Sequence, residues 1–146
     1  MAFQVRQISA HDTLDVRHAV LRQGKPLSSC VFEGDNLAST VHFGAFENNK
    51  LLGVASVFWH DTALGDVHPK TQIRGMAVLL EAQNLGLGRL LMESIEMHLR
   101  QRNDTFVWFN ARVGAIAFYE KMGYVEIGSI FDVQDIGPHI LMYKYL

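Results

Sequence analysis

The segment from Ile73 to Arg89 constrains the fold of this chain more than any other. Residues 73–78 are mostly apolar and predict a buried strand, and residues 83–89 (Q-N-L-G-L-G-R) predict a glycine-rich turn that opens a helix. Gly86 and Gly88 lack Cβ, so their backbone can adopt positive φ angles and approach a ligand closely. The free N–H groups and the dipole at the helix start favour a phosphate group. Taken alone, the spacing Q-x-x-G-x-G is equally compatible with an ordinary turn, since it matches neither the dinucleotide fingerprint nor the P-loop.

The helix predicted after this turn has one apolar face and one polar face. Its apolar positions recur at i, i+4 and i+8, and its charged positions, Glu96 and Arg100 among them, are expected to face solvent as a weak pair. The run 105–109 that follows is apolar without alternation, which is typical of a strand covered on both faces. Such a strand–helix–strand unit predicts two parallel neighbouring strands joined by a right-handed crossover.

The remaining pattern predicts a single domain over residues 1–146 with a mixed α/β sheet. Residues 3–8 alternate as a strand, and a helix follows with Ser9 as its N-cap. Residues 30–32 are expected to line a pocket or to form a short helix within a loop. A hairpin is predicted from 40–46 and 51–60, a loop over 61–69, and a final antiparallel pair at 123–128 and 139–146. The connection within that pair is predicted as a loop containing Asp132, Asp135, Gly137 and Pro138.

Composition excludes several classes of protein. Hydrophobic residues make up 49% of the chain and charged residues 19%, as in an ordinary globular domain. The net charge is −2 without a basic run, which argues against a nucleic acid partner. The single cysteine, Cys30, cannot form an internal disulfide and fits a reducing compartment. No apolar run is long enough to span a membrane or act as a leader, so we expect a cytoplasmic protein.

A second motif lies about twenty residues after the first. Residues 115–124 read A-I-A-F-Y-E-K-M-G-Y, and together with Gln83, Gly86 and Gly88 they resemble the GNAT superfamily of acyl-CoA-dependent N-acyltransferases. The resemblance implies an α/β (α+β) fold with a mostly antiparallel mixed sheet, two splayed central parallel strands and flanking helices. It also implies that acetyl-CoA is the cosubstrate, with no metal, and that its pantetheine arm lies between the splayed strands. The cofactor-binding residues implied are Met76, Ala77, Val78, Gln83, Asn84, Leu85, Gly86, Leu87, Gly88, Arg89, Asn110, Phe118 and Tyr119.

The resemblance places Tyr119 at the family's general-acid position, where it would donate a hydrogen bond or a proton to the leaving CoA thiolate. The alternative is a helix tyrosine packed on the core. Asn110 matches a position that contacts the CoA arm or a water, and a helix N-cap is the alternative. Residues 72–76 supply no carboxylate, so the general base stays open among Glu33, Asp35, His139 and a water chain to solvent.

These features favour an N-acetyltransferase that acts on a primary amine of a small molecule by direct attack within a ternary complex. Two alternatives remain: a noncatalytic acyl-CoA-binding or sensing module, and a protein N-acetyltransferase acting on a lysine or an N-terminus. Arg74, Arg89, Arg112 and Lys121 lie near the two motifs, where they could meet the CoA phosphates. Histidines at positions 60 and 68 lack a metal-binding pattern. A homodimer is also left open.

Overall fold

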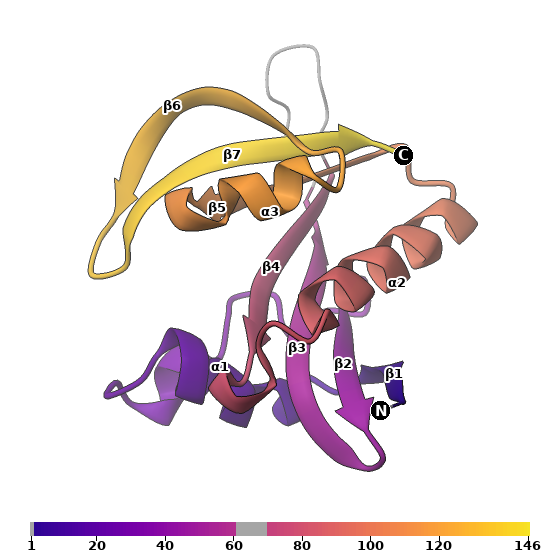
Figure 1. The fold of residues 1–146 in the computed structure, drawn as a ribbon, viewed down its shortest axis with the longest axis vertical. Helices are drawn as coiled ribbons and strands as arrows, with labels where there is room; N and C mark the ends of the chain where they lie inside the picture. Colours follow the sequence, from indigo (N-terminus) through magenta and orange to yellow (C-terminus); the bar gives the residue numbers. More distant parts are fainter. Residues whose placement is uncertain (1, 61–69) are drawn as a thin grey trace.

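The computed structural model describes residues 2–60 and 70–146 as a sheet with helices on both faces (Figure 1). The elements, with η marking short 3-10 turns, are β1 (Phe3–Ile8), η1 (His11–Thr13), α1 (Leu14–Leu21), η2 (Leu27–Cys30), β2 (Val41–Glu47), β3 (Lys50–Trp59), β4 (Thr71–Val78), η3 (Leu80–Ala82), α2 (Leu87–Gln101), β5 (Phe106–Arg112), η4 (Val113–Ala115), α3 (Ile116–Glu120), β6 (Val125–Val133) and β7 (Gly137–Tyr145). The predicted loop at 61–69 lies outside the described residues.

The sheet has seven strands in the order β1-β2-β3-β4-β5-β7-β6. The pair β4 and β5 is parallel, whereas the other neighbouring pairs are antiparallel. Strands β4 and β5 pair only at Gln72 and Trp108, and they separate toward their C-terminal ends. The predicted fold class, a mostly antiparallel mixed sheet with two splayed parallel strands, is therefore confirmed.

Helices cover the two faces of the sheet unequally. Helix α2 buries Leu91, Ile95 and Leu99 completely in the main core, which also contains α3 and side chains from β2 to β5 and β7. Helix α1 packs on the other face, where Val16 contacts a smaller cluster with residues of β3 and β4. The splayed ends of β4 and β5 are thus accessible from both sides of the sheet.

A β-bulge lies in the middle of β4. Ser56 on β3 pairs with Arg74 and Val54 pairs with Ala77, so one residue of β3 faces both Gly75 and Met76. Gly75 has a φ of +67°, a left-handed conformation that favours glycine. The bulge changes which residues of β4 face each side, and the sequence pattern did not predict it.

Two predictions about local structure are wrong. The loop predicted between the last strands is mostly strand, since Asp132 belongs to β6 and Gly137 and Pro138 belong to β7. Only residues 134–136 connect the two, with Asp135 at a φ of +65°. Strand β6 is an exposed edge strand that tolerates polar residues, and its alternation of apolar and polar residues stops after Ile127, where the register of the strand is irregular.

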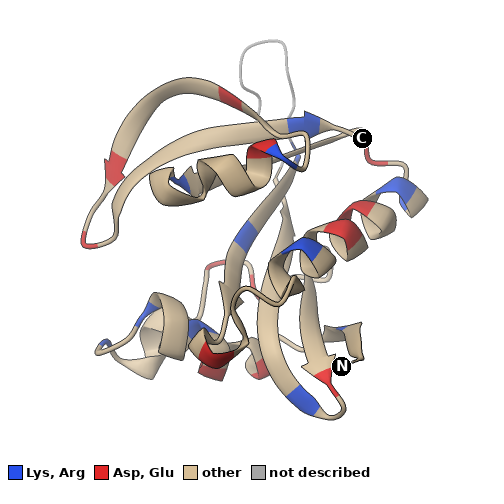
Figure 2. Cartoon of the chain, viewed as in Figure 1, with Lys and Arg blue, Asp and Glu red and all other residues tan. Residues whose placement is uncertain are grey.

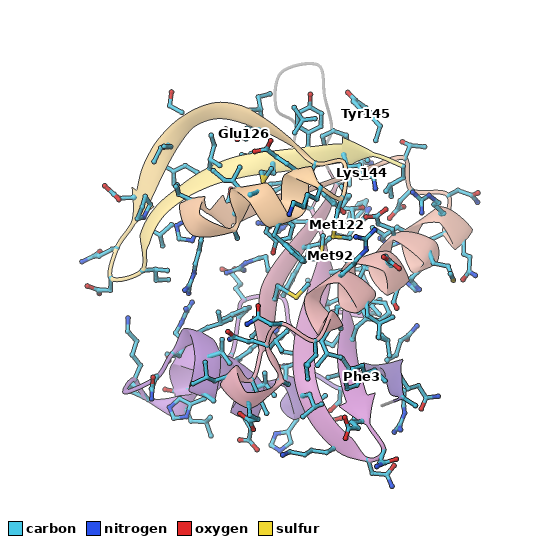
Figure 3. All side chains as sticks on the ribbon, viewed as in Figure 1. Phe3, Met92, Met122, Glu126, Lys144 and Tyr145 are labelled. Atoms are coloured by element: carbon cyan, nitrogen blue, oxygen red, sulfur yellow. The ribbon has the colours of Figure 1, made fainter. Side chains whose placement is uncertain are left out.

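The second error concerns Glu96, which is buried instead of facing solvent. Its carboxylate accepts hydrogen bonds from Tyr124 Oη at 2.9 Å, Lys144 Nζ at 2.8 Å and Arg100 Nη2 at 3.3 Å. Lys144 lies on β7, above Met122 in Figure 3, and also donates to the Met122 carbonyl oxygen at 2.8 Å. Glu96 therefore connects α2 to the strand pair β6–β7, a role that the helical period alone could not reveal because the partners are distant in sequence.

Candidate active site

A cleft of about 440 Å³ lies between the separated ends of β4 and β5. Its walls come from Gln72–Val78 on β4, Phe109–Arg112 on β5 and parts of both sheet faces. Gly88 and Met92 of α2 contribute on one face, and Met92 extends from α2 toward the strands in Figure 3. Leu21 at the end of α1 contributes on the other face. The cleft therefore connects the two faces of the sheet through the gap between the parallel strands.

The predicted glycine turn lies at the α2 side of this cleft. Gly86 is the N-cap of α2 with a φ of +86°, no atom lies within 4 Å of where its Cβ would be, and no side chain caps the helix. The first N–H groups of α2 are therefore available to a ligand. Gln83 and Gly88 line the cleft, and Gln83 Nε2 donates to the Val78 carbonyl oxygen at 3.0 Å.

The other predicted residues of the turn lie outside the cleft lining. Asn84, with a φ of +64°, and Leu85 are exposed. Leu87 is 1% exposed, and its side chain packs in the main core, so only its backbone N–H is placed to bind a ligand. Arg89 is exposed and forms an ion pair with Glu93 at 2.7 Å.

The backbone of β4 offers a second set of binding groups. Beyond Gln72 this strand pairs with no described residue on the side of β5, so backbone groups of Met76, Ala77 and Val78 border the cleft without a strand partner there, although the Val78 carbonyl accepts from Gln83. Such a free edge can pair with an extended ligand that carries amide groups, as an added strand would.

Tyr119 contributes its side chain from α3. It is 8% exposed, and its ring packs against Phe109 with centroids 4.5 Å apart. Its hydroxyl forms no hydrogen bond within the described residues, and it lines the cleft. Burial raises the pKa of Tyr119 to about 12, against a weaker opposing effect of Arg112. The hydroxyl therefore stays protonated at neutral pH and is free to donate a hydrogen bond.

Asn110 and Phe118 lie near Tyr119 but in different surroundings. Asn110 is exposed on β5 and lines the cleft. Phe118 is 40% exposed, its ring centroid lies 5.0 Å from that of Tyr119, and its Cζ lies 3.4 Å from where a Cβ on Gly88 would be. An exposed aromatic ring beside the glycine turn can pack against an apolar part of a ligand.

Of the candidate bases, only His139 lines the cleft. It is 7% exposed, and its Nδ1 lies 2.8 Å from the Gly137 carbonyl oxygen. Because a carbonyl can only accept, Nδ1 must donate, which leaves Nε2 of the neutral ring as an acceptor. Glu33 is exposed and lies outside the cleft lining.

Asp35 is engaged in a buried ion pair with Arg17. Arg17 is fully buried and donates to Asp35 at 2.7 and 3.1 Å, to the Cys30 carbonyl oxygen at 2.8 Å and to Ser56 Oγ at 3.0 Å. Asp35 also accepts from the Phe32 N–H at 2.9 Å. Burial acts to raise the pKa of Asp35, but the hydrogen bonds from Arg17 and Phe32 outweigh it and lower the pKa.

This network fixes the position of Phe32, which lines the cleft. The Arg17 guanidinium carbon lies 3.9 Å from the centroid of the Phe32 ring. Sequence reasoning missed the network because its members come from α1, the segment from Cys30 to Asp35 and β3, and no local spacing joins them. Of residues 30–32, only Cys30 belongs to a short 3-10 turn and only Phe32 lines the cleft, so each of the two alternatives applies to one residue.

The described residues contain no group of His, Cys, Asp and Glu side chains that could hold a metal ion. Of the histidines considered at the sequence level, position 68 lies outside the described residues, and His60 is hydrogen-bonded to Gln72 Oε1 at 2.7 Å. Among the helices of the described part of the chain, none has the length and apolar character needed to cross a membrane.

Comparison with known proteins identifies the family. The family model described as "Acetyltransferase (GNAT) family" matches residues 10–124. The chain is 33% identical over 143 residues to the uncharacterized N-acetyltransferase YitI of Bacillus subtilis (strain 168), covering 98% of this chain and 96% of that protein.

Solved structures share the fold. The ribosomal-protein-S18-alanine N-acetyltransferase from Escherichia coli superposes with a TM-score of 0.76 at 20% identity, covering 99% of this chain and 94% of that one. An aminoglycoside 6'-N-acetyltransferase complexed with coenzyme A superposes with a TM-score of 0.74 at 16% identity, covering 97% and 96%. On the strength of the family match and the YitI relationship, the chain belongs to the acetyltransferase (GNAT) family of acyltransferase enzymes.

Proposed function

We propose that this protein transfers an acetyl group from acetyl-CoA to the primary amine of a small molecule, by direct attack within a ternary complex. The acceptor ammonium first loses one proton to a base; the amine nitrogen then forms a bond to the acetyl carbon, the carbon–sulfur bond breaks, and the nitrogen loses its second proton while the CoA thiolate gains one. Membership of the family and a cleft that crosses the sheet both support this reaction. The volume of about 440 Å³ suits a small acceptor.

The residues present fit acetyl-CoA. The N–H groups at the start of α2, next to the open Gly86 turn, would hold the pyrophosphate. The free backbone edge at Met76–Val78 would pair with the amides of the pantetheine arm. Bound there, acetyl-CoA supplies an activated thioester. The protein must bring the amine to it, exclude water, accept a proton from the amine and stabilise or protonate the leaving thiolate.

Tyr119 carries the proposal, because it lines the cleft and its hydroxyl has no hydrogen-bond partner among the described residues. A thiol titrates near 8.5, about 3.5 units below Tyr119, so complete proton transfer to the thiolate would cost about 5 kcal/mol. Tyr119 therefore acts mainly as a hydrogen-bond donor to the charge that develops on sulfur. The raised pKa keeps this donor protonated through the whole physiological range.

We assign proton removal from the amine to His139. The acceptor is an ammonium group at pH 7, with a pKa near 10.4, and it must lose a proton before attack, at a cost of about 4–5 kcal/mol. His139 is the one candidate base in the described cleft lining, and its Nε2 is left as the acceptor. Replacement by asparagine should lower kcat with the best amine at saturating acetyl-CoA, whereas an unchanged kcat would favour a water chain to solvent.

Release of free thiol from acetyl-CoA, measured with a colorimetric thiol reagent across a panel of amines, tests the reaction itself. The panel contains amino acids, small amines, polyamines, a lysine peptide and a peptide with a free N-terminus. Thiol release with a small amine, and the acetylated product by mass spectrometry, is the expected result. Tight acetyl-CoA binding without thiol release for any amine would instead identify a noncatalytic acyl-CoA sensor, and release with peptides alone would identify a protein acetyltransferase.

A further inference from the structure

The charged side chains that line the cleft are mostly positive. Arg22, Arg74 and Arg112 line it, and no Asp or Glu of the described residues does. Within the described parts of the chain, none of these arginines belongs to an ion pair. Figure 2 shows a basic segment and no acidic one on β4, whereas basic and acidic segments lie together along α2.

Arg74 and Arg22 approach the same aromatic ring. The Arg74 guanidinium carbon lies 4.7 Å from the centroid of the Phe32 ring and 5.5 Å from that of Phe58. The Arg22 guanidinium carbon lies 5.6 Å from the Phe32 centroid. Both arginines thus lie at the α1 side of the cleft, beside an apolar wall that Val20 extends.

Among the described residues, no carboxylate forms an ion pair with Arg74 or Arg22. Asp35 is committed to Arg17. Burial of the half-buried Arg74 lowers its pKa, and the charges of Arg17 and Arg22 lower it further, against opposing effects of Asp35 and the exposed Glu33. An incoming anion would relieve this repulsion, and a cationic group would increase it.

These arginines lie on the face of the sheet opposite the glycine turn. Ile73, the neighbour of Arg74, packs in the core with α2, so Arg74 projects toward α1. The pyrophosphate is proposed to bind at the start of α2, on the other face. Arg74 and Arg22 are therefore placed to contact the acceptor, and in this proposal Arg74 binds the acceptor and not the CoA phosphates.

We infer that the acceptor is a small primary amine that also carries an anionic oxygen group, foremost a carboxylate, which Arg74 and Arg22 bind. This inference rests on the proposed acetyl transfer. A guanidinium group matches a carboxylate with two parallel hydrogen bonds, and Phe32 and Val20 offer apolar contact to the body of the acceptor. Polyamines and aminoglycosides lack the anionic group and would meet only positive charge at this position.

The test uses amines that differ only in the anionic group. Leucine and phenylalanine are compared with 3-methylbutylamine and phenethylamine, O-phosphoethanolamine is compared with ethanolamine, and spermidine represents polycations. Thiol release gives kcat and KM, and calorimetry with CoA-saturated protein gives the binding constant without turnover. The variants are Arg74→Gln and Arg22→Gln, with Arg6→Gln as the matched control, because Arg6 is exposed on β1 and far from the cleft lining.

The expected result is about a 10- to 100-fold preference for the carboxylate-bearing amine over its decarboxylated partner, as a charge-assisted hydrogen-bond pair provides. Arg74→Gln should raise KM for the amino acids by a similar factor and leave both KM for the neutral amines and the affinity for acetyl-CoA unchanged. A preference for O-phosphoethanolamine alone would assign the site to phosphate.

Three results would each overturn the inference. The first is that neutral amines or spermidine are used as well as the amino acids. The second is that Arg74→Gln loses activity equally with every amine, and the third is that none of the anionic amines binds measurably. Binding of amino acids that depends on Arg74 but yields no thiol would instead refute the proposed acetyl transfer and leave the anion site standing. The two failures are therefore distinguishable.

Discussion

The buried pair of Arg17 and Asp35 gives the sharpest stability prediction, in the variant Asp35→Asn. The side chains are 0% and 2% exposed, and the carboxylate accepts two hydrogen bonds from Arg17 and one from the Phe32 N–H. Asparagine keeps the shape and one acceptor oxygen but leaves the Arg17 charge buried without its counter-ion. Breaking a buried pair in this way costs about 3–5 kcal/mol, and we expect about 3 kcal/mol here because one oxygen remains.

Urea unfolding followed by circular dichroism measures this loss. With a slope of about 2 kcal/mol per molar urea, the midpoint should fall by about 1.5 M. Glu93→Gln is the matched control, because its pair with Arg89 has the same 2.7 Å distance but both side chains are more than half exposed. That control should change stability by less than about 0.5 kcal/mol.

The pH dependence follows from the lowered pKa of Asp35. A carboxyl whose pKa is lower in the folded state contributes stability above its unfolded value of 3.8, and this contribution disappears as the pH falls through the folded value. The difference in unfolding free energy between the wild type and Asp35→Asn should therefore shrink below about pH 4. A loss below about 1 kcal/mol at pH 7, or a difference that does not change in acid, would refute this description of the pair.

Further predictions concern the bulge and Glu96. Gly75→Ala should lower the melting temperature by about 4–10 °C, because the left-handed φ costs about 1–2 kcal/mol and the new Cβ would lie 3.0 Å from Phe32 Cε2. Gly114→Ala is the control, since its Cβ would enter open space and its φ is not positive. The control should leave the melting temperature unchanged in the same thermal unfolding scan. Glu96→Ala should cost about 3 kcal/mol in urea unfolding, because three donors lose a buried acceptor. Glu93→Ala should change little, and equal effects of the two glutamates would contradict the assigned burial.

Two local motifs predicted the glycine turn and the helix that carries Tyr119, and both border the cleft, whereas the acceptor side of the cleft could not be predicted, for a physical reason. The glycine turn and Tyr119 lie in two local motifs, where spacing along the chain determines spacing in the fold. Arg74, Phe32 and His139 come from three separate segments and meet only because of the sheet order and the bulge at Gly75. No periodicity encodes that meeting. Buried Glu96 was misjudged for the same reason, since its partners Tyr124 and Lys144 are distant in sequence, whereas β6 was misjudged because it is an exposed edge strand.

The central claim, that Tyr119 stabilises the leaving thiolate in this cleft, is tested most directly by Tyr119→Phe. Phenylalanine keeps the ring packing against Phe109 and removes only the hydroxyl. With the amine that gives the fastest thiol release, kcat should fall by about 100-fold, and the dissociation constant of acetyl-CoA should stay within about twofold. Tyr145→Phe, at an exposed position outside the cleft lining, should match the wild type. A Tyr119→Phe enzyme with full kcat would contradict the account.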